Sequence, residues 1–171
     1  TLTHETEYPR EGAVKLRLGL RKADTFNVRL RIPAWSKTTQ VLLNGEPVEG
    51  VKPGAYLSLE RKWKNGDTLD LTFDMSPRHW AGELSRTGTA AVYRGPLLLA
   101  FDPKYNEMDT ADMPALDARK LDSQPVKVEA RFQPLVARQF TASDGRKVVL
   151  CDFATAGAHG TDYAAWLPVV N

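Results

Sequence analysis

Residues 26–35 read FNVRLRIPAW, and this stretch decides the fold class. Apolar and polar residues alternate from Phe26 to Ile32, so one side of the segment is apolar and the other is polar. A period of two residues is typical of a β-strand that is buried on one face. Pro33 cannot donate a backbone hydrogen bond, so it ends the strand or lies at a sheet edge.

The same period recurs in residues 13–21, AVKLRLGLR, and in residues 68–75, TLDLTFDM. Clean alternation favours antiparallel sheets with one solvated face over the continuous apolar strands of a parallel sheet. Turn signals separate the segments, and they are Pro9, Asn44-Gly45, Pro53-Gly54, Asn65-Gly66 and Asp144-Gly145. The sequence therefore predicts an all-β fold, an antiparallel β-sandwich built from one or two small jelly-roll or immunoglobulin-like units.

The chain has 171 residues, enough for one large β-domain or two small ones. The composition changes near the middle of the chain, and we place a soft boundary around residues 84–87. This predicts a first sandwich unit over residues 1–84 and a second over residues 85–171, with a single larger sandwich as the alternative. Residues 103–125 are rich in Asp, Met and Pro without a steady period, so we expect a long loop or crossover there.

The bulk numbers exclude several classes of partner. The net charge is +2, and the basic residues are scattered along the strands, so we expect no nucleic acid as a partner. No apolar run approaches the roughly 20 residues that span a bilayer, so we expect no membrane partner either. The chain opens on polar residues without an initiator Met, which indicates a piece of a longer protein and leaves the compartment open.

The usual catalytic and cofactor motifs do not occur in the sequence. His4, His79 and His159 are far apart, and no zinc, P-loop, dinucleotide or nucleophile-elbow pattern is present. Cys151, the single cysteine, lies in the apolar run VVLCDF and is expected to be a small buried residue rather than a nucleophile. We therefore expect no catalytic residue, no metal ligand and no cofactor in this chain.

A cluster of carboxyl groups between residues 109 and 117 is a weaker candidate for a cation site. Asp109, Asp112 and Asp117 could gather around Ca²⁺, although they do not match the known calcium loop. Glycoside hydrolysis needs two carboxyl groups at a fixed separation, and no spacing in the sequence singles out such a pair.

Four tryptophans lie near the expected strand ends and are the best candidates for contact with a ligand. Trp35 and Trp63 adjoin strands with well-formed apolar faces, so we expect both to close the core. His79 and Trp80 lie in a polar stretch, RHWAGE, and are candidate contacts to a carbohydrate or to another protein surface.

Five motifs in order give the sequence a family resemblance. They are TEYPREGAVKLRL (6–18), FNVRLRIPAW (26–35), VLLNGEPV (41–48), GAYLSLERKWKNGDTLDLTFDM (54–75) and AVYRGPLLLAFD (91–102). Together they resemble the region that follows the catalytic barrel in glycoside hydrolase family 127, the β-L-arabinofuranosidase-like group. The end of the chain, from VLCDF to LPV, is similar to the end of such proteins in outline, and residues 103–121 match least.

The resemblance implies that the catalytic machinery lies elsewhere. In that family a cysteine nucleophile and a zinc site of cysteines and a glutamate belong to an N-terminal α/α-barrel, and none of these residues can be carried over to this chain. The resemblance therefore implies a non-catalytic, C-terminal accessory β-sandwich region of a glycoside hydrolase, whose partner is the α/α-barrel of the same polypeptide. A homodimer contact is a further expectation. The alternatives are a carbohydrate-binding module that uses exposed tryptophans and an immunoglobulin-like adhesion or assembly domain.

Overall fold

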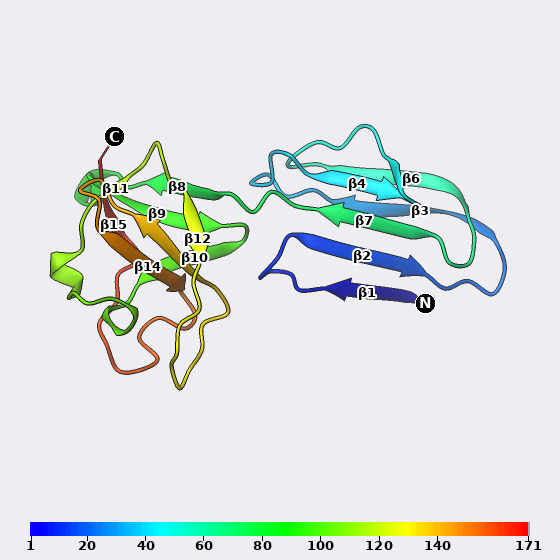
Figure 1. Cartoon of the computed structure of the whole chain (residues 1–171). Coiled ribbons are helices and arrows are strands. Elements are labelled where there is room, and N and C mark those ends of the chain that lie inside the picture. The colour runs from blue at the N-terminus through cyan, green and yellow to red at the C-terminus, as the bar shows by residue number, and fades with distance from the viewer. Residues whose placement is uncertain (171) are drawn as a thin grey trace. The chain divides into compact units, whose positions relative to one another are not determined.

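The structure of the chain is a computed structural model that describes residues 1–170. These residues form β-strands and three short 3₁₀ helices, and they contain no α-helix. The fold is all-β with predominantly antiparallel sheets, which confirms the fold class predicted from the sequence (Figure 1). The chain divides into two compact units, the first Thr1–Met75 and the second from Ser76 onward.

Unit 1 is a sandwich of a five-stranded antiparallel sheet and a two-stranded one. In spatial order the larger sheet contains β1 (Leu2–Thr6), β2 (Ala13–Leu18), β7 (Thr68–Thr72), β4 (Gln40–Leu43) and β5 (Glu46–Pro47). The smaller sheet pairs β3 (Asp24–Arg31) with β6 (Tyr56–Trp63) along their full length. The three alternating segments of the sequence are thus β2, β3 and β7, as predicted.

The core of unit 1 fills the space between these two sheets. Its buried residues are Leu16, Leu18, Leu30, Ile32, Val41, Leu57, Trp63, Leu69 and Leu71. Trp63 is fully buried, and its indole Nε1 donates to the carbonyl of Phe26 at 2.9 Å, so the one polar atom of the ring is satisfied. Alternate residues of β2 and β7 supply the core, as in Leu16 and Leu18 and in Leu69 and Leu71, which is the arrangement that the period-two pattern requires.

Unit 2 is built on one eight-stranded sheet. Its path runs β11 (Leu116–Asp117), β15 (Leu167–Val170), β9 (Thr89–Arg94), β10 (Leu97–Phe101), β14 (Lys147–Asp152), β13 (Ala137–Thr141) and β12 (Ser123–Pro125), and β8 (Pro77–Ala81) pairs with the other side of β9. The 3₁₀ helices are η1 (Leu84–Arg86), η2 (Pro103–Tyr105) and η3 (Thr110–Asp112). All pairs are antiparallel except β11 with β15.

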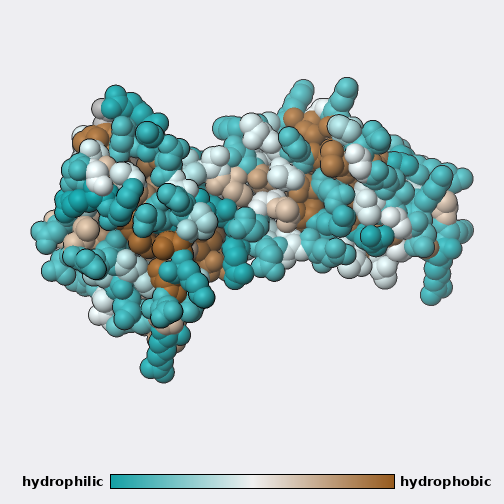
Figure 2. Space-filling view, in the orientation of Figure 1, coloured by the Kyte–Doolittle hydropathy of each residue, from teal (hydrophilic) through white to brown (hydrophobic). Residues whose placement is uncertain are grey.

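The core of unit 2 lies on one face of that sheet. It is formed by Val92, Leu99, Phe101, Met113, Leu116, Val136, Phe140, Ala142, Val148, Leu150 and Leu167. Met113 and Leu116 come from the segment that the sequence marked as a long loop, which also contains η2, η3, β11 and β12. Apolar residues reach the surface in patches over both units (Figure 2).

The division between the units lies earlier in the chain than the boundary drawn from the sequence at residues 84–85. The reason is β8, which pairs with β9 residue for residue from Pro77↔Arg94 to Ala81↔Ala90 and so belongs to unit 2. Residues 77–81, PRHWA, show no period-two pattern because β8 is an edge strand with a poorly buried side. None of the helices among residues 1–170 is both long and apolar enough to cross a membrane.

Candidate functional site

His79 and Trp80, the site residues predicted from the sequence, both lie in β8. His79 pairs with Val92, a core residue, whereas Trp80 pairs with Ala91 on the opposite face of the sheet. Successive residues of a strand point to opposite faces, so the two side chains do not converge on one ligand. Both side chains are exposed, and Trp80 has 65% of its surface accessible. The role of His79 and Trp80 as carbohydrate or interface contacts stays a prediction. A ligand on one face of the sheet would contact only one of the two side chains.

The other tryptophans are less accessible. Trp63 closes the core of unit 1, as predicted, and its ring stacks on Phe26 with the centroids 5.9 Å apart. Trp35 is half-buried, and its ring packs at 57° against Phe73, which borders the same core. Trp166 is half-buried as well. Trp80 is therefore the one tryptophan that offers most of its ring to solvent.

The face that carries Trp80 also carries Arg78 and Tyr93. The guanidinium of Arg78 lies over the Tyr93 ring at 4.9 Å from its centroid, and Arg78 Nη1 donates to the carbonyl of Gly95 at 2.6 Å. Burial lowers the pKa of Arg78 below its ordinary value, and the nearby Tyr93 acts in the opposite direction. The cation thus lies over an aromatic ring and is fixed by a carbonyl.

Two buried aspartates fix the loops at one end of unit 2. Asp102 accepts hydrogen bonds from Lys104 N at 2.8 Å, Thr161 Oγ1 at 2.7 Å and Gly157 N at 2.9 Å. Asp102 is fully buried, so these bonds replace the hydration that it loses on folding. It therefore joins η2 to the loop of residues 153–163.

Asp152 has the same kind of role. It accepts from Val136 N at 3.1 Å and from Thr155 Oγ1 at 2.9 Å, and it is 3% exposed. Both buried aspartates are occupied by backbone and hydroxyl donors of the loops they hold. This arrangement differs from a glycosidase pair, in which one carboxyl group on each side must reach the scissile bond.

Cys151 is a free, fully buried thiol in β14. Burial raises the pKa of its thiol to about 12, and the negative charges of Asp152 and Asp102 act in the same direction. A nucleophilic cysteine needs the opposite shift, because the thiolate is the reactive form. The structure therefore confirms Cys151 as a small buried residue.

An aromatic cluster covers the loops next to these aspartates. His159 Nε2 accepts from Phe132 N at 3.2 Å, and the Tyr105 hydroxyl donates to the carbonyl of Phe132 at 3.3 Å. The His159 ring contacts Phe132 at 5.4 Å and Tyr105 at 6.1 Å between centroids. Burial, followed by the charges of Cys151, Asp102 and Asp152, raises the pKa of Tyr105 to about 12. The cluster fastens the segment around Phe132 to the body of unit 2.

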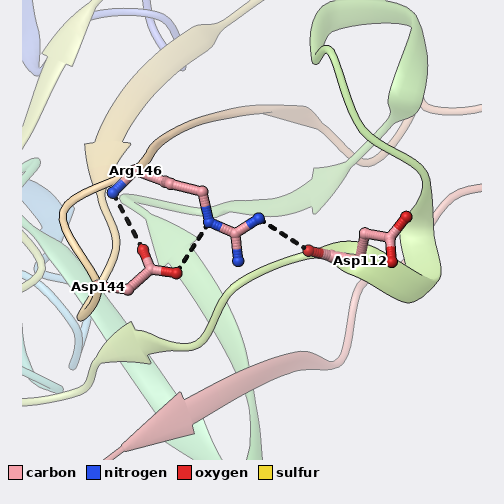
Figure 3. Close-up of polar contacts among 3 residues, drawn as sticks. All are labelled: Asp112, Asp144 and Arg146. Atoms are coloured by element: carbon pink, nitrogen blue, oxygen red, sulfur yellow. Dashed lines mark hydrogen bonds and ion pairs between the residues drawn. The ribbon is translucent and has the colours of Figure 1, made fainter.

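The acidic residues considered for Ca²⁺ do not come together. Asp117 pairs with Arg119 at 3.3 Å on the surface. Asp112 contributes its carbonyl oxygen to Arg146 Nη1 at 3.4 Å, while Asp144 binds the same arginine through its Nε at 2.8 Å (Figure 3). Within residues 1–170 no three His, Cys, Asp or Glu side chains form a group that could hold a metal ion.

An open hollow of about 640 Å³ lies where η3 approaches the end of the 153–163 loop. It is lined by Pro103, Asp109, Thr110, Ala111, Thr161 and Asp162. Its walls carry two carboxyl groups but no aromatic ring. A sugar site usually combines convergent polar groups with an aromatic platform, so this hollow has only one of the two features.

Comparisons with known proteins connect this architecture to carbohydrate-active enzymes. Residues 1–75 match the family model of the middle domain of β-L-arabinofuranosidases of glycoside hydrolase family 127 (GH127). No curated protein sequence matches the chain significantly. The matched model is that of a middle domain, so the C-terminal position implied by the sequence resemblance is not confirmed for unit 1.

Three solved structures resemble the whole chain. One, named as a glycoside hydrolase, matches with a TM-score of 0.82 and 25% identity over 99% of this chain and 32% of its own. A GH127 β-arabinofuranosidase matches with a TM-score of 0.80 and 24% identity, over 99% and 31% of the two chains. A GH127 β-L-arabinofuranosidase from Geobacillus stearothermophilus T6 matches with a TM-score of 0.77 and 20% sequence identity. This match covers 99% of the present chain and 30% of the arabinofuranosidase chain. The chain therefore spans about a third of the length of these solved chains.

Proposed function

We propose that the chain is a non-catalytic accessory region of a family 127 glycoside hydrolase that packs on and supports a catalytic domain of the same polypeptide. The observation that carries the proposal is the family-model match to residues 1–75, because its last residue is also the last residue of unit 1. A match that covers one complete structural unit is stronger support than a match that crosses a boundary. The structural likeness extends through unit 2, since it covers 99% of the chain.

The proposal assigns a position to each unit. Unit 1 is the middle domain, and unit 2 is a second β-domain that follows it. The family resemblance of the sequence implies that the catalytic cysteine and the zinc site belong to an α/α-barrel, and the proposal puts that barrel before both units. This is consistent with the side chains present here, because the Cys151 thiol is buried with a raised pKa and the buried Asp102 and Asp152 hold loops.

A carbohydrate-binding module is the second candidate, and one observation favours it. Trp80 exposes 65% of its surface, as a sugar-stacking ring must. The neighbouring charged group, Arg78, is already held by Tyr93 and Gly95, and Trp63 is buried in the core. A single exposed tryptophan gives weaker support than the domain match, so we rank this function second.

Two assays on the purified chain test the proposal. The chain should not release nitrophenol from a nitrophenyl β-L-arabinofuranoside, whereas the complete polypeptide that the gene encodes should do so. Turnover by the chain on its own would refute the accessory role. A glycan array probed with the chain decides the second candidate: binding that is lost in Trp80→Ala would establish it, and an array without signal would remove it.

A further inference from the structure

A row of side chains crosses the outer face of the unit 2 sheet, the face opposite to the core. The strand registers put Arg78 of β8 opposite Tyr93 of β9, and Tyr93 opposite Leu98 of β10. Phe153 N donates to the carbonyl of Leu98 at 2.9 Å, which extends the β10–β14 register by one residue and places Phe153 opposite Leu98. Residues directly opposite one another share a face, so these four side chains form one row of roughly 14 Å.

Two further aromatic residues widen the row. Trp80 lies two positions after Arg78 on the same face of β8. Tyr163 contacts Phe153 edge-on, with the ring centroids 5.7 Å apart at 78°. We call the set the aromatic row, and it consists of Arg78, Trp80, Tyr93, Leu98, Phe153 and Tyr163.

The aromatic row is open to solvent at both ends. Trp80, Phe153 and Tyr163 are 65%, 43% and 47% exposed, and the central Tyr93 and Leu98 are half-buried. Three large exposed rings on one sheet face are unusual for a surface that meets only water. Tryptophan, tyrosine and arginine are the residue types that are enriched at the energetic centres of protein interfaces.

Buried hydrogen bonds fix the loop that carries Phe153 and Tyr163. Asp152 binds Thr155, and Asp102 binds both Gly157 N and Thr161 Oγ1. The Tyr163 ring packs so closely on Gly157 that a Cβ there would lie 2.7 Å from Tyr163 Cδ1. Two buried carboxyl groups therefore fix an irregular loop whose aromatic rings face outward. Fixing the rings in advance lowers the entropy cost of binding a partner. A fixed, exposed ring brings this advantage only when a partner binds to it.

We propose that the aromatic row is the surface on which the catalytic domain of the longer polypeptide docks, an inference that rests on the proposed function. The argument for this occupant is length: each solved chain that resembles this one extends well beyond the similarity, which covers 30% to 32% of it. In those chains the remaining two thirds belong to the same polypeptide as the similar region, so that part is the partner that is always present beside it. The row offers exposed apolar rings and one guanidinium that already contacts Tyr93 and the carbonyl of Gly95, which suits an apolar protein surface better than a sugar with its many hydroxyl groups.

Hydroxyl-radical footprinting of the complete polypeptide tests the docking surface. Oxidation rates at Trp80, Phe153 and Tyr163 are measured by mass spectrometry in the complete polypeptide and in the 171-residue chain. We expect the rates to fall at least threefold in the complete polypeptide. Tyr56 is the comparison residue, because it is 57% exposed on β6 of unit 1, outside the row. Unchanged rates at the three rings would overturn the docking surface.

A variant of Trp80 adds an energetic readout. Trp80→Asp should leave the melting temperature of the 171-residue chain within about 2 °C, because 65% of the surface of this residue is exposed. In the complete polypeptide the same change should lower the melting temperature by more than 5 °C, whereas Tyr56→Asp should not. Equal effects of the two variants in the complete polypeptide would contradict the proposal.

Separate readouts distinguish the two levels of inference. Hydrolysis by the complete polypeptide together with unprotected rings overturns the docking surface and leaves the accessory function intact. Protected rings in a complete polypeptide that hydrolyses no arabinoside overturn the accessory function and with it the identity of the partner. Protection of the same rings in the isolated chain by added arabinan would identify the row as a sugar site and overturn the docking proposal.

Discussion

Asn44 and Asp67 join two turns of unit 1 that are far apart in the sequence. Asn44 Nδ2 donates to Asp67 Oδ1 at 3.0 Å, and Asn44 Oδ1 accepts from Thr68 N at 2.8 Å. Asp67 Oδ2 accepts from Lys64 N at 2.9 Å, which closes its own turn. Asn44 itself has a φ of 52°, a left-handed conformation that asparagine tolerates. The pair fixes the end of β4 against the start of β7.

Removing the Asp67 carboxyl group should destabilise unit 1. Asp67→Ala removes the acceptor of two part-buried hydrogen bonds, from Asn44 Nδ2 and from Lys64 N, so we expect a loss of about 1–2 kcal/mol in the free energy of unfolding. Urea unfolding followed by the amide signals of β4 and β7 measures it. Glu46→Ala, an exposed change in the same hairpin, is the control and should stay within about 0.5 kcal/mol. Equal effects of the two changes would refute the role of the pair.

The same carboxyl group predicts a pH dependence. The hydrogen bond from Lys64 N, above all, holds the pKa of Asp67 below its ordinary value, with Asn44 contributing against the effect of burial. A lowered pKa gives stability that is present above the ordinary pKa of aspartate and is lost as the pH falls through the folded value. The wild-type chain should therefore exceed Asp67→Asn in stability at pH 7, and the gap should narrow as the pH falls below the ordinary pKa of aspartate. A gap that is independent of pH would contradict this assignment.

Much of unit 1 could be predicted from the sequence because its signals are local. The Asn44-Gly45 dipeptide predicted a hairpin, and it lies between β4 and β5 with φ values of 52° and 89°. The Asn65-Gly66 dipeptide predicted a turn, and Asp67 closes that turn by accepting from Lys64 N. Trp63 was expected in the core and is fully buried. Each of these follows from residues that are close in sequence or from a strict period of two.

Gly157 should tolerate no side chain, whereas Gly160 in the same loop should tolerate one better. Both have positive φ, 75° and 78°, so alanine costs about 1–2 kcal/mol of strain at either position. At Gly157 the added Cβ would also lie 2.7 Å from Tyr163 Cδ1, while at Gly160 it would meet nothing within 4 Å. Gly157→Ala should therefore cost about 1–3 kcal/mol more than Gly160→Ala in thermal unfolding of unit 2.

A spectroscopic readout separates that clash from general strain. The contact between Phe153 and Tyr163 should disappear from nuclear Overhauser spectra of Gly157→Ala and persist in Gly160→Ala. Identical spectra for the two variants would show that the Tyr163 ring does not depend on the close approach to Gly157.

Cys151 should be unreactive in the folded chain. Its pKa is raised to about 12, chiefly by burial, so the thiol stays protonated at pH 8 and no thiolate is available to an alkylating reagent. Iodoacetamide at pH 8 should leave the native chain unmodified over hours and modify it within minutes in concentrated urea. Rapid modification of the native chain would show that the thiol is accessible.

The surface of unit 2 could not be predicted in the same way because it depends on strand register. The sequence singled out His79 and Trp80 together as candidate contacts. Both lie in β8, where successive side chains point to opposite faces of the sheet. Tyr93 and Phe153 join Trp80 through pairings between strands that are distant in sequence. The one local hint was the density of aromatic residues in residues 153–166, which does not say which face they occupy.

The most direct test of the accessory role is to remove this chain from the complete polypeptide. The account predicts that the remaining catalytic part unfolds at a temperature at least 5 °C lower than in the complete polypeptide, and that the separately purified 171-residue chain restores part of the loss when it is added back. A catalytic part that keeps its full arabinosidase activity and its melting temperature without this chain would contradict the account.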